Sequence, residues 1–129
     1  MLEAVVEACQ AHGIEAIRWP WEPGGRGAKP WLLQALCRRG ARVAAELARP
    51  VALWGLTASG QLTTPRLAAI ARRLPPGVSE IMVHPATADE VAYPGYLGAQ
   101  ELAALLDASI AAQLPAPVTF GALARPATR

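Results

Sequence analysis

The sequence predicts an α/β fold with about four parallel strands and flanking helices, and three observations support this prediction. Apolar residues make up 53% of the 129 residues and charged residues only 17%, so the chain can bury a core as a single domain (1–129). Segments with helical apolar spacing alternate with short apolar runs, which is typical of parallel strands joined by right-handed crossovers. Four strands cannot close an eight-stranded barrel, so the chain forms either a small open sheet or about half of a larger barrel.

The predicted helices each carry recognisable start or stop signals. They are expected at residues 2–9, 30–47, 64–74 and 100–114. Pro30 and Pro65 lie where the first turn of a helix needs no backbone N–H donor. Gly13 is placed as a left-handed cap after the first helix, and Gly40 is expected to bend the second. The last helix is expected to pack through one apolar face, formed by Leu102, Leu105, Leu106 and Ile110.

The predicted strands are followed by loops rich in glycine, proline and polar residues. Strands are expected at 14–18, 51–56, 79–84 and 118–120, and the second is apolar throughout, as in a strand buried on both faces. Ligands of parallel α/β folds gather at the carboxyl ends of the strands. The loops after the first three strands are therefore the places where a site is expected.

His84 is the sharpest candidate within these loops. It ends the third predicted strand, and the proline after it restricts the turn. Imidazole has an ordinary pKa of about 6.5, so it can donate or accept a proton near neutrality. The alternative is a structural histidine that anchors the loop.

The loop after the first predicted strand carries the other candidates. The guanidinium of Arg18 is suited to orienting a carboxylate, although an ion pair with Glu22 is the simpler alternative. The flat rings of Trp19 and Trp21 suit the apolar faces of sugars, although core packing is the commoner role of a tryptophan.

Composition and missing motifs exclude several functions. A net charge of +2, with the basic residues scattered, gives no footprint for nucleic acid. The sequence has no P-loop, no nucleophile elbow and no Cys-x-x-Cys, and its two histidines are too far apart to form a metal pair. Cys9 and Cys37 are expected to be buried free thiols. No signal peptide or membrane span is visible, which favours the cytoplasm.

Three segments around the candidate loops carry a family resemblance. They are Gly13–Pro23, Gly55–Thr63 and Leu74–Thr87, and Tyr96 followed by the helix around Glu101 adds to them. Together they resemble the YdjC-like carbohydrate deacetylases over about residues 2–120, with the His-Pro segment the most specific. The branch associated with hopanoid biosynthesis is the most similar.

The resemblance implies a fold and a reaction. The family fold is a distorted (β/α) barrel of roughly twice this length, so this chain would be its C-terminal half. The family implies that a metal-bound water attacks the acetamide of an N-acetylated sugar, with an aspartate as base and a histidine as general acid. By position His84 matches that acid and Arg18 matches an arginine that orients the base, while Glu22 would line the sugar site.

The sequence also departs from the family. The Asp-Asp motif and the His-rich motif that supply metal ligands are absent, so the divalent metal of the family is not expected on this chain alone. Two hypotheses stay open: the C-terminal part of a deacetylase, inactive by itself, or a non-catalytic protein that binds an N-acetylated sugar or glycolipid. A half-barrel leaves sheet edges and apolar surface uncovered, so a homodimer is expected.

Overall fold

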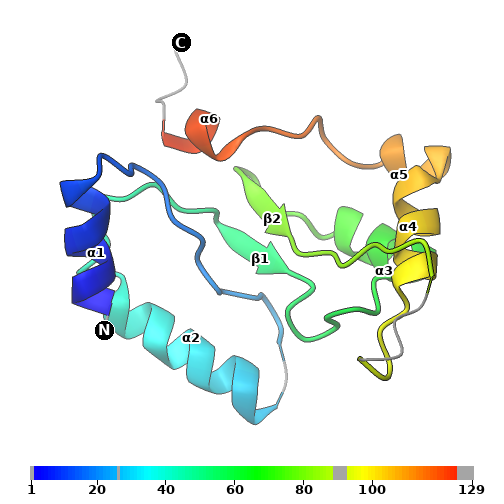
Figure 1. The fold of residues 1–129 in the computed structure, drawn as a ribbon, viewed down its shortest axis with the longest axis horizontal. Coiled ribbons are helices and arrows are strands. Elements are labelled where there is room, and N and C mark those ends of the chain that lie inside the picture. Colours follow the sequence, from blue (N-terminus) through cyan, green and yellow to red (C-terminus); the bar gives the residue numbers. More distant parts are fainter. Residues whose placement is uncertain (1, 26, 89–92, 125–129) are drawn as a thin grey trace.

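The computed structural model describes residues 2–25, 27–88 and 93–124, and it confirms a mixed helix and strand fold. The helices are α1 (Leu2–Ala11), α2 (Ala28–Gly40), α3 (Thr64–Ala71), α4 (Gly98–Leu106), α5 (Ala108–Ala111) and α6 (Phe120–Ala124). The strands are β1 (Ala52–Trp54) and β2 (Ser79–Ile81). Figure 1 shows the two strands in the middle, with α1 and α2 on one side and α3, α4 and α5 on the other.

The two strands form a parallel pair at the centre of the molecule. The register pairs Ala52 with Ser79, Leu53 with Glu80 and Trp54 with Ile81. All three residues of β1 are buried, as its apolar run predicts. The chain after α1 passes along the other edge of β1, where Leu53 N donates to Trp21 O at 2.8 Å. The carboxyl ends of both strands therefore lie near three segments: the chain after α1, the loop after β1 and the loop after β2.

Two of the four predicted strands form, and the other two segments differ from prediction. Residues 14–18 make only an isolated parallel bridge between Ala16 and Ala48. Pro20 has no N–H to continue such a ladder, and Trp21 N turns back to Trp19 O at 2.8 Å. The strand expected at 118–120 is wrong because Phe120 begins α6. The structure therefore shows a two-stranded sheet rather than a four-stranded partial barrel.

Two predicted helices are shorter than expected. The helix from Pro30 ends at Gly40 instead of bending there, and residues 41–47 form turns. The last predicted helix divides into α4 and α5 at Asp107, whose extended backbone and side chain cap α5 by accepting Ser109 N at 2.8 Å. A capping aspartate competes with helix continuation, which explains the division.

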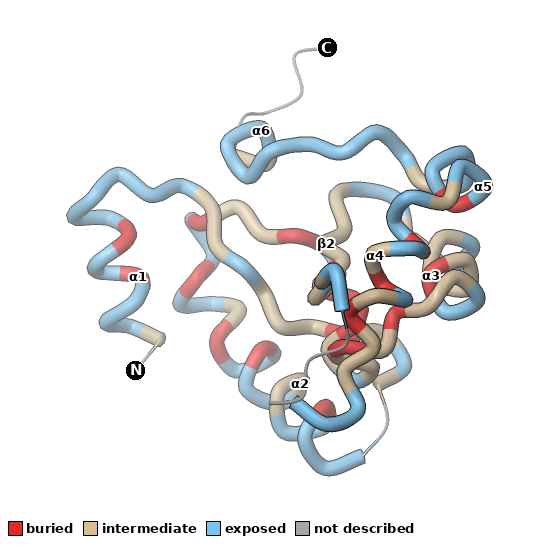
Figure 2. The backbone as a smooth tube through the Cα atoms, turned by 45° about the vertical axis from the view of Figure 1, so that its right-hand side comes forward, coloured by how far each residue is buried: buried red, intermediate tan, exposed pale blue. Residues whose placement is uncertain are grey.

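Two small apolar cores lie on opposite sides of the strand pair, as the buried segments in Figure 2 indicate. One lies under α1 and contains Val6, Cys9, Ala44 and Leu47; the other lies between α3, α4 and α5 and contains Leu67, Ala104 and Ile110. Leu105 and Leu106, predicted to face inward, are exposed, because α4 turns Glu101 and Ala104 toward the core instead.

The cysteine and membrane predictions agree with the structure. Cys9 and Cys37 are buried free thiols, and burial raises the pKa of the Cys37 thiol, partly offset by the charge of Arg49. Within the described ranges no helix is long and apolar enough to cross a membrane.

Candidate functional site

A buried carboxylate joins the first two candidate loops. The side chain of Glu22 is 6% exposed, and its oxygens accept Gly55 N at 2.9 Å and Thr57 N at 2.8 Å. We call this set the Glu22 clamp. Hydrogen bonds to an ionised group are worth about 1.5–3 kcal/mol each, so the clamp ties the loop after β1 firmly to the segment beside it.

A second buried carboxylate joins the loop after β1 to the loop after β2. Glu101 of α4 is fully buried, with Oε1 accepting Leu62 N at 2.7 Å and Oε2 accepting His84 N at 2.5 Å. We call this set the Glu101 clamp. Because α4 packs against α3, the position of His84 is set by the helical layer as well as by its own strand.

The ring of His84 packs against an aromatic residue from the following loop. The ring centroids of His84 and Tyr96 are 5.1 Å apart in an edge-to-face arrangement. Tyr96 Oη lies 3.1 Å from Ser59 Oγ, and Leu97 N donates to Gly60 O at 2.6 Å. His84 Nδ1 is buried without a hydrogen-bond partner in the described part of the chain. His84 therefore has a backbone N–H held by Glu101 and a ring nitrogen that makes no hydrogen bond to a described residue.

Arg18 pairs with a residue that the sequence did not single out. Its Nε donates to Glu80 Oε1 at 2.7 Å, and its Nη2 contacts the same oxygen, so the alternative of an ion pair with Glu22 is wrong. Arg18 is 58% exposed, which limits such a pair to about 1 kcal/mol or less. The described contacts of Arg18 do not join it to His84.

The two tryptophans of the first loop contact the helices around α1 and α2. Trp19 packs against the core under α1 and lies beneath Arg49, and Trp21 lies beneath Arg38 of α2. Both tryptophans therefore lie on the side of this segment that faces α1 and α2. A sugar-binding role for Trp19, Trp21 and Glu22 stays a prediction, since packing and clamping account for their observed contacts.

No pattern in the sequence indicates the clamping role of Glu101. A glutamate in the first turn of a helix is usually exposed to solvent and interacts favourably with the helix dipole. Its burial follows from the approach of α4 to the two loops, which only the three-dimensional arrangement shows. Tyr96 is part of the family resemblance, but nothing in the sequence predicts its contact with His84.

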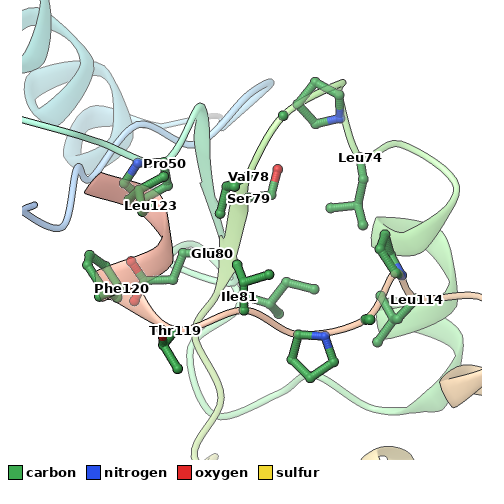
Figure 3. Close-up of a pocket in the computed structure, with 16 residues that line it drawn as sticks. Pro50, Leu74, Val78, Ser79, Glu80, Ile81, Leu114, Thr119, Phe120 and Leu123 are labelled. Carbon is green, nitrogen blue, oxygen red and sulfur yellow. The ribbon is translucent and has the colours of Figure 1, made fainter. Parts of the chain in front are cut away.

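One cavity of the structure lies away from His84. It measures about 510 Å³, at the amino ends of the strands, and is lined mostly by proline and aliphatic side chains. Figure 3 shows Glu80 of β2 extending toward Phe120 and Thr119 at one side of it. A cavity of about 380 Å³ lies instead at the carboxyl end of β1, between the loop that carries Glu22 and α3. Ligands of parallel folds favour that second position.

The residues that the structure describes cannot form a metal site. Across residues 2–25, 27–88 and 93–124, no group of three or more His, Cys, Asp or Glu side chains could hold a metal ion. Both clamp carboxylates already accept two backbone N–H groups each.

The chain matches a known protein family over most of its length. A family model described as YdjC-like protein matches residues 1–116. No curated protein and no solved structure matches the chain. The matched range contains both clamps, His84 and Tyr96.

Proposed function

Because this chain belongs to the YdjC-like family, we propose that it carries the His-Pro part of a carbohydrate N-deacetylase active site. The observation that supports this most directly is the setting of His84, whose backbone N–H is held by the buried Glu101 and whose ring rests against Tyr96. A general acid needs a fixed position and a ring nitrogen that can hold a mobile proton.

In the proposed reaction His84 supplies the proton for the departing amine. In the complete enzyme a water molecule would add its oxygen to the acetyl carbon and lose a proton to a carboxylate base from the other half of the barrel. When the bond between that carbon and the nitrogen then breaks, the imidazolium would give its proton to the nitrogen, so that acetate and the free amino sugar result. Arg18 is a positioning residue in this proposal, with its guanidinium held by Glu80. Glu22 supports the sugar site by fixing Gly55 and Thr57.

The divalent metal of the family does not fit the residues described here, so the proposal routes no step through it. We propose that this chain corresponds to the C-terminal half of the family barrel, in the hopanoid-associated (HpnK-like) branch, and is inactive alone. An in-frame sequence upstream of the Met1 codon that encodes the Asp-Asp and His-rich motifs would support this, and a stop codon there would contradict it. A cytoplasmic location stays a prediction.

The two histidines of the chain allow a direct binding test. NMR of the imidazole protons during titration with N,N′-diacetylchitobiose should shift the signals of His84 and leave those of the exposed His12 unchanged. The matched variants are His84→Gln, which should weaken sugar binding, and His12→Gln, which should not. Unchanged His84 signals at about 10 mM sugar, where even weak binding shows, would contradict the proposed site.

Amine release separates catalysis from binding. Fluorescamine detection of free amine, with and without added Zn²⁺, should show no release by this chain alone if it is an inactive part of the enzyme. Release that His84→Gln abolishes would show activity in the chain itself and contradict the claim of inactivity. Sugar binding in a chain whose gene has no upstream metal motifs favours the non-catalytic alternative.

We also propose that the chain forms a homodimer. Trp31, Leu32 and Leu36 of α2 are all more than half exposed, at 70%, 53% and 55%. Apolar residues gathered on one helix favour association. Sedimentation should give a dimer at micromolar concentration, and a clean monomer would contradict the proposal.

A further inference from the structure

The cavity at the carboxyl end of β1 has a wall with more hydrogen-bond donors than acceptors. Arg66 of α3 and Arg73, just past its end, line one side, and among the described residues of the lining the only acidic side chain is Glu22. The oxygens of Glu22 already accept two backbone N–H groups. Trp54, beneath the cavity, has an indole N–H that is buried without a partner in the described ranges.

Arg73 is positioned by contacts that do not involve a carboxylate. Its guanidinium lies over the Trp54 ring, 5.5 Å from the centroid. It also reaches Gly24, where an added Cβ would be 3.3 Å from Nη2 and where φ is +71°. A positive φ favours glycine, so the loop conformation itself keeps this approach open. The planar fork of arginine therefore faces the cavity region in a defined position.

Arg66 lies seven residues earlier along the same side of the helical segment. Its Nη1 donates to Gln61 O at 3.2 Å and to Gln61 Oε1 at 2.7 Å, both uncharged acceptors. In the described part of the chain the one recorded ion pair joins Arg18 and Glu80, so neither Arg66 nor Arg73 is neutralised by an acid. Two guanidiniums and one carboxylate leave the cavity lining with a net charge of +1.

We propose that this cavity binds the oxyanion group, phosphate or carboxylate, of a small polar molecule. Arg73 would form the main contact, because guanidinium forks match both anions in geometry. Arg66 and the exposed Thr57 would contact the rest of the molecule. The cavity shares Glu22, Gly55 and Thr57 with the loops assigned to the sugar in the proposed function, but its lining does not include His84, and the anion proposal does not depend on deacetylase activity.

The test is a titration of the full chain followed by ¹H–¹⁵N NMR. The probes are inorganic phosphate, glucose 6-phosphate, glucuronate and, as the neutral control, glucose. We expect saturable shifts at Gly24, Gly25 and Arg73 with the charged sugars and none with glucose. Tighter binding of glucose 6-phosphate than of glucuronate identifies a phosphate site, and the reverse order identifies a carboxylate site.

Arg72 and Arg73, the two residues that follow α3, provide a matched pair of variants. Arg73→Gln should weaken binding by about tenfold or more, the effect of losing a charge-assisted contact. Arg72→Gln removes the same charge from an exposed neighbour that does not line the cavity, and should change binding by less than about twofold. If Arg73→Gln does not fold, Arg66→Gln and Arg73→Lys replace it and should each weaken binding. Equal losses in the Arg72 and Arg73 variants, equal binding of glucose, or no saturable shift with any anion would overturn the proposal.

Discussion

The Glu101 clamp can be tested by a substitution that keeps its shape. In Glu101→Gln one oxygen stays as an acceptor, but the other becomes an NH₂ group that faces a backbone N–H of Leu62 or His84. Losing one bond to an ionised acceptor costs about 1.5–3 kcal/mol, and the buried N–H left without a partner raises that cost. Because Glu101 is fully buried, water cannot replace the lost acceptor. We expect the free energy of unfolding to fall by about 3 kcal/mol.

Urea denaturation followed by tryptophan fluorescence measures this change, which corresponds to a fall in Tm of about 10 °C. Amide hydrogen exchange adds the location, since the N–H of Leu62 or His84 should lose protection before the rest of the fold. Glu7→Gln, on the exposed side of α1, is the matched control and should change stability by less than about 0.5 kcal/mol. A loss as small as that in Glu101→Gln, with both amides still protected, would refute the clamp.

Two further predictions concern a cap and a glycine. The hydrogen bond from the Ser109 side chain, and then that from its backbone, lower the pKa of Asp107, so this carboxylate stabilises the fold above its unfolded-state pKa and loses that effect as pH falls through the folded value. The stability difference between wild type and Asp107→Ala should therefore shrink in urea titrations run from pH 7 toward pH 2, and a constant difference would contradict this. Gly60→Ala should destabilise the protein more than Gly13→Ala in thermal unfolding, because both glycines have positive φ but only at Gly60 would a Cβ overlap a ring, that of Tyr96. Equal losses of stability in the two variants would show that the Tyr96 ring moves aside, which would contradict this prediction.

The elements that could be predicted from sequence are those with strong local signals. The apolar run around Leu53 became the buried β1, and the proline at position 65 lies in the first turn of α3, as expected. The apolar pattern around Ala16 predicts a strand, but Pro20 and the turn at Trp21 limit its pairing to a single bridge. Phe120 was misassigned because a three-residue apolar run fits a strand or the start of a helix equally well.

The sequence predicts which loops carry the candidate residues, but not which groups those residues contact. The rule that ligands gather at carboxyl ends of strands selected the loops at Glu22, Thr57 and His84. It could not show that Glu22 points away from Arg18 and toward the backbone of the next loop. A partner 33 or 35 residues away leaves no pattern in local spacing.

The sequence by itself determined the mixed helix and strand character of the chain, the positions of β1 and β2, and the family to which the chain belongs. These follow from short-range properties: apolar period, proline and glycine geometry, and a His-Pro segment that can be compared directly. The tertiary structure alone decided which polar side chains are buried. Burying Glu101 requires two N–H donors from separate loops to meet one carboxylate, and only the packing of α4 against those loops brings them together. The position of His84 is therefore a property of the whole fold and not only of β2, the strand that precedes it.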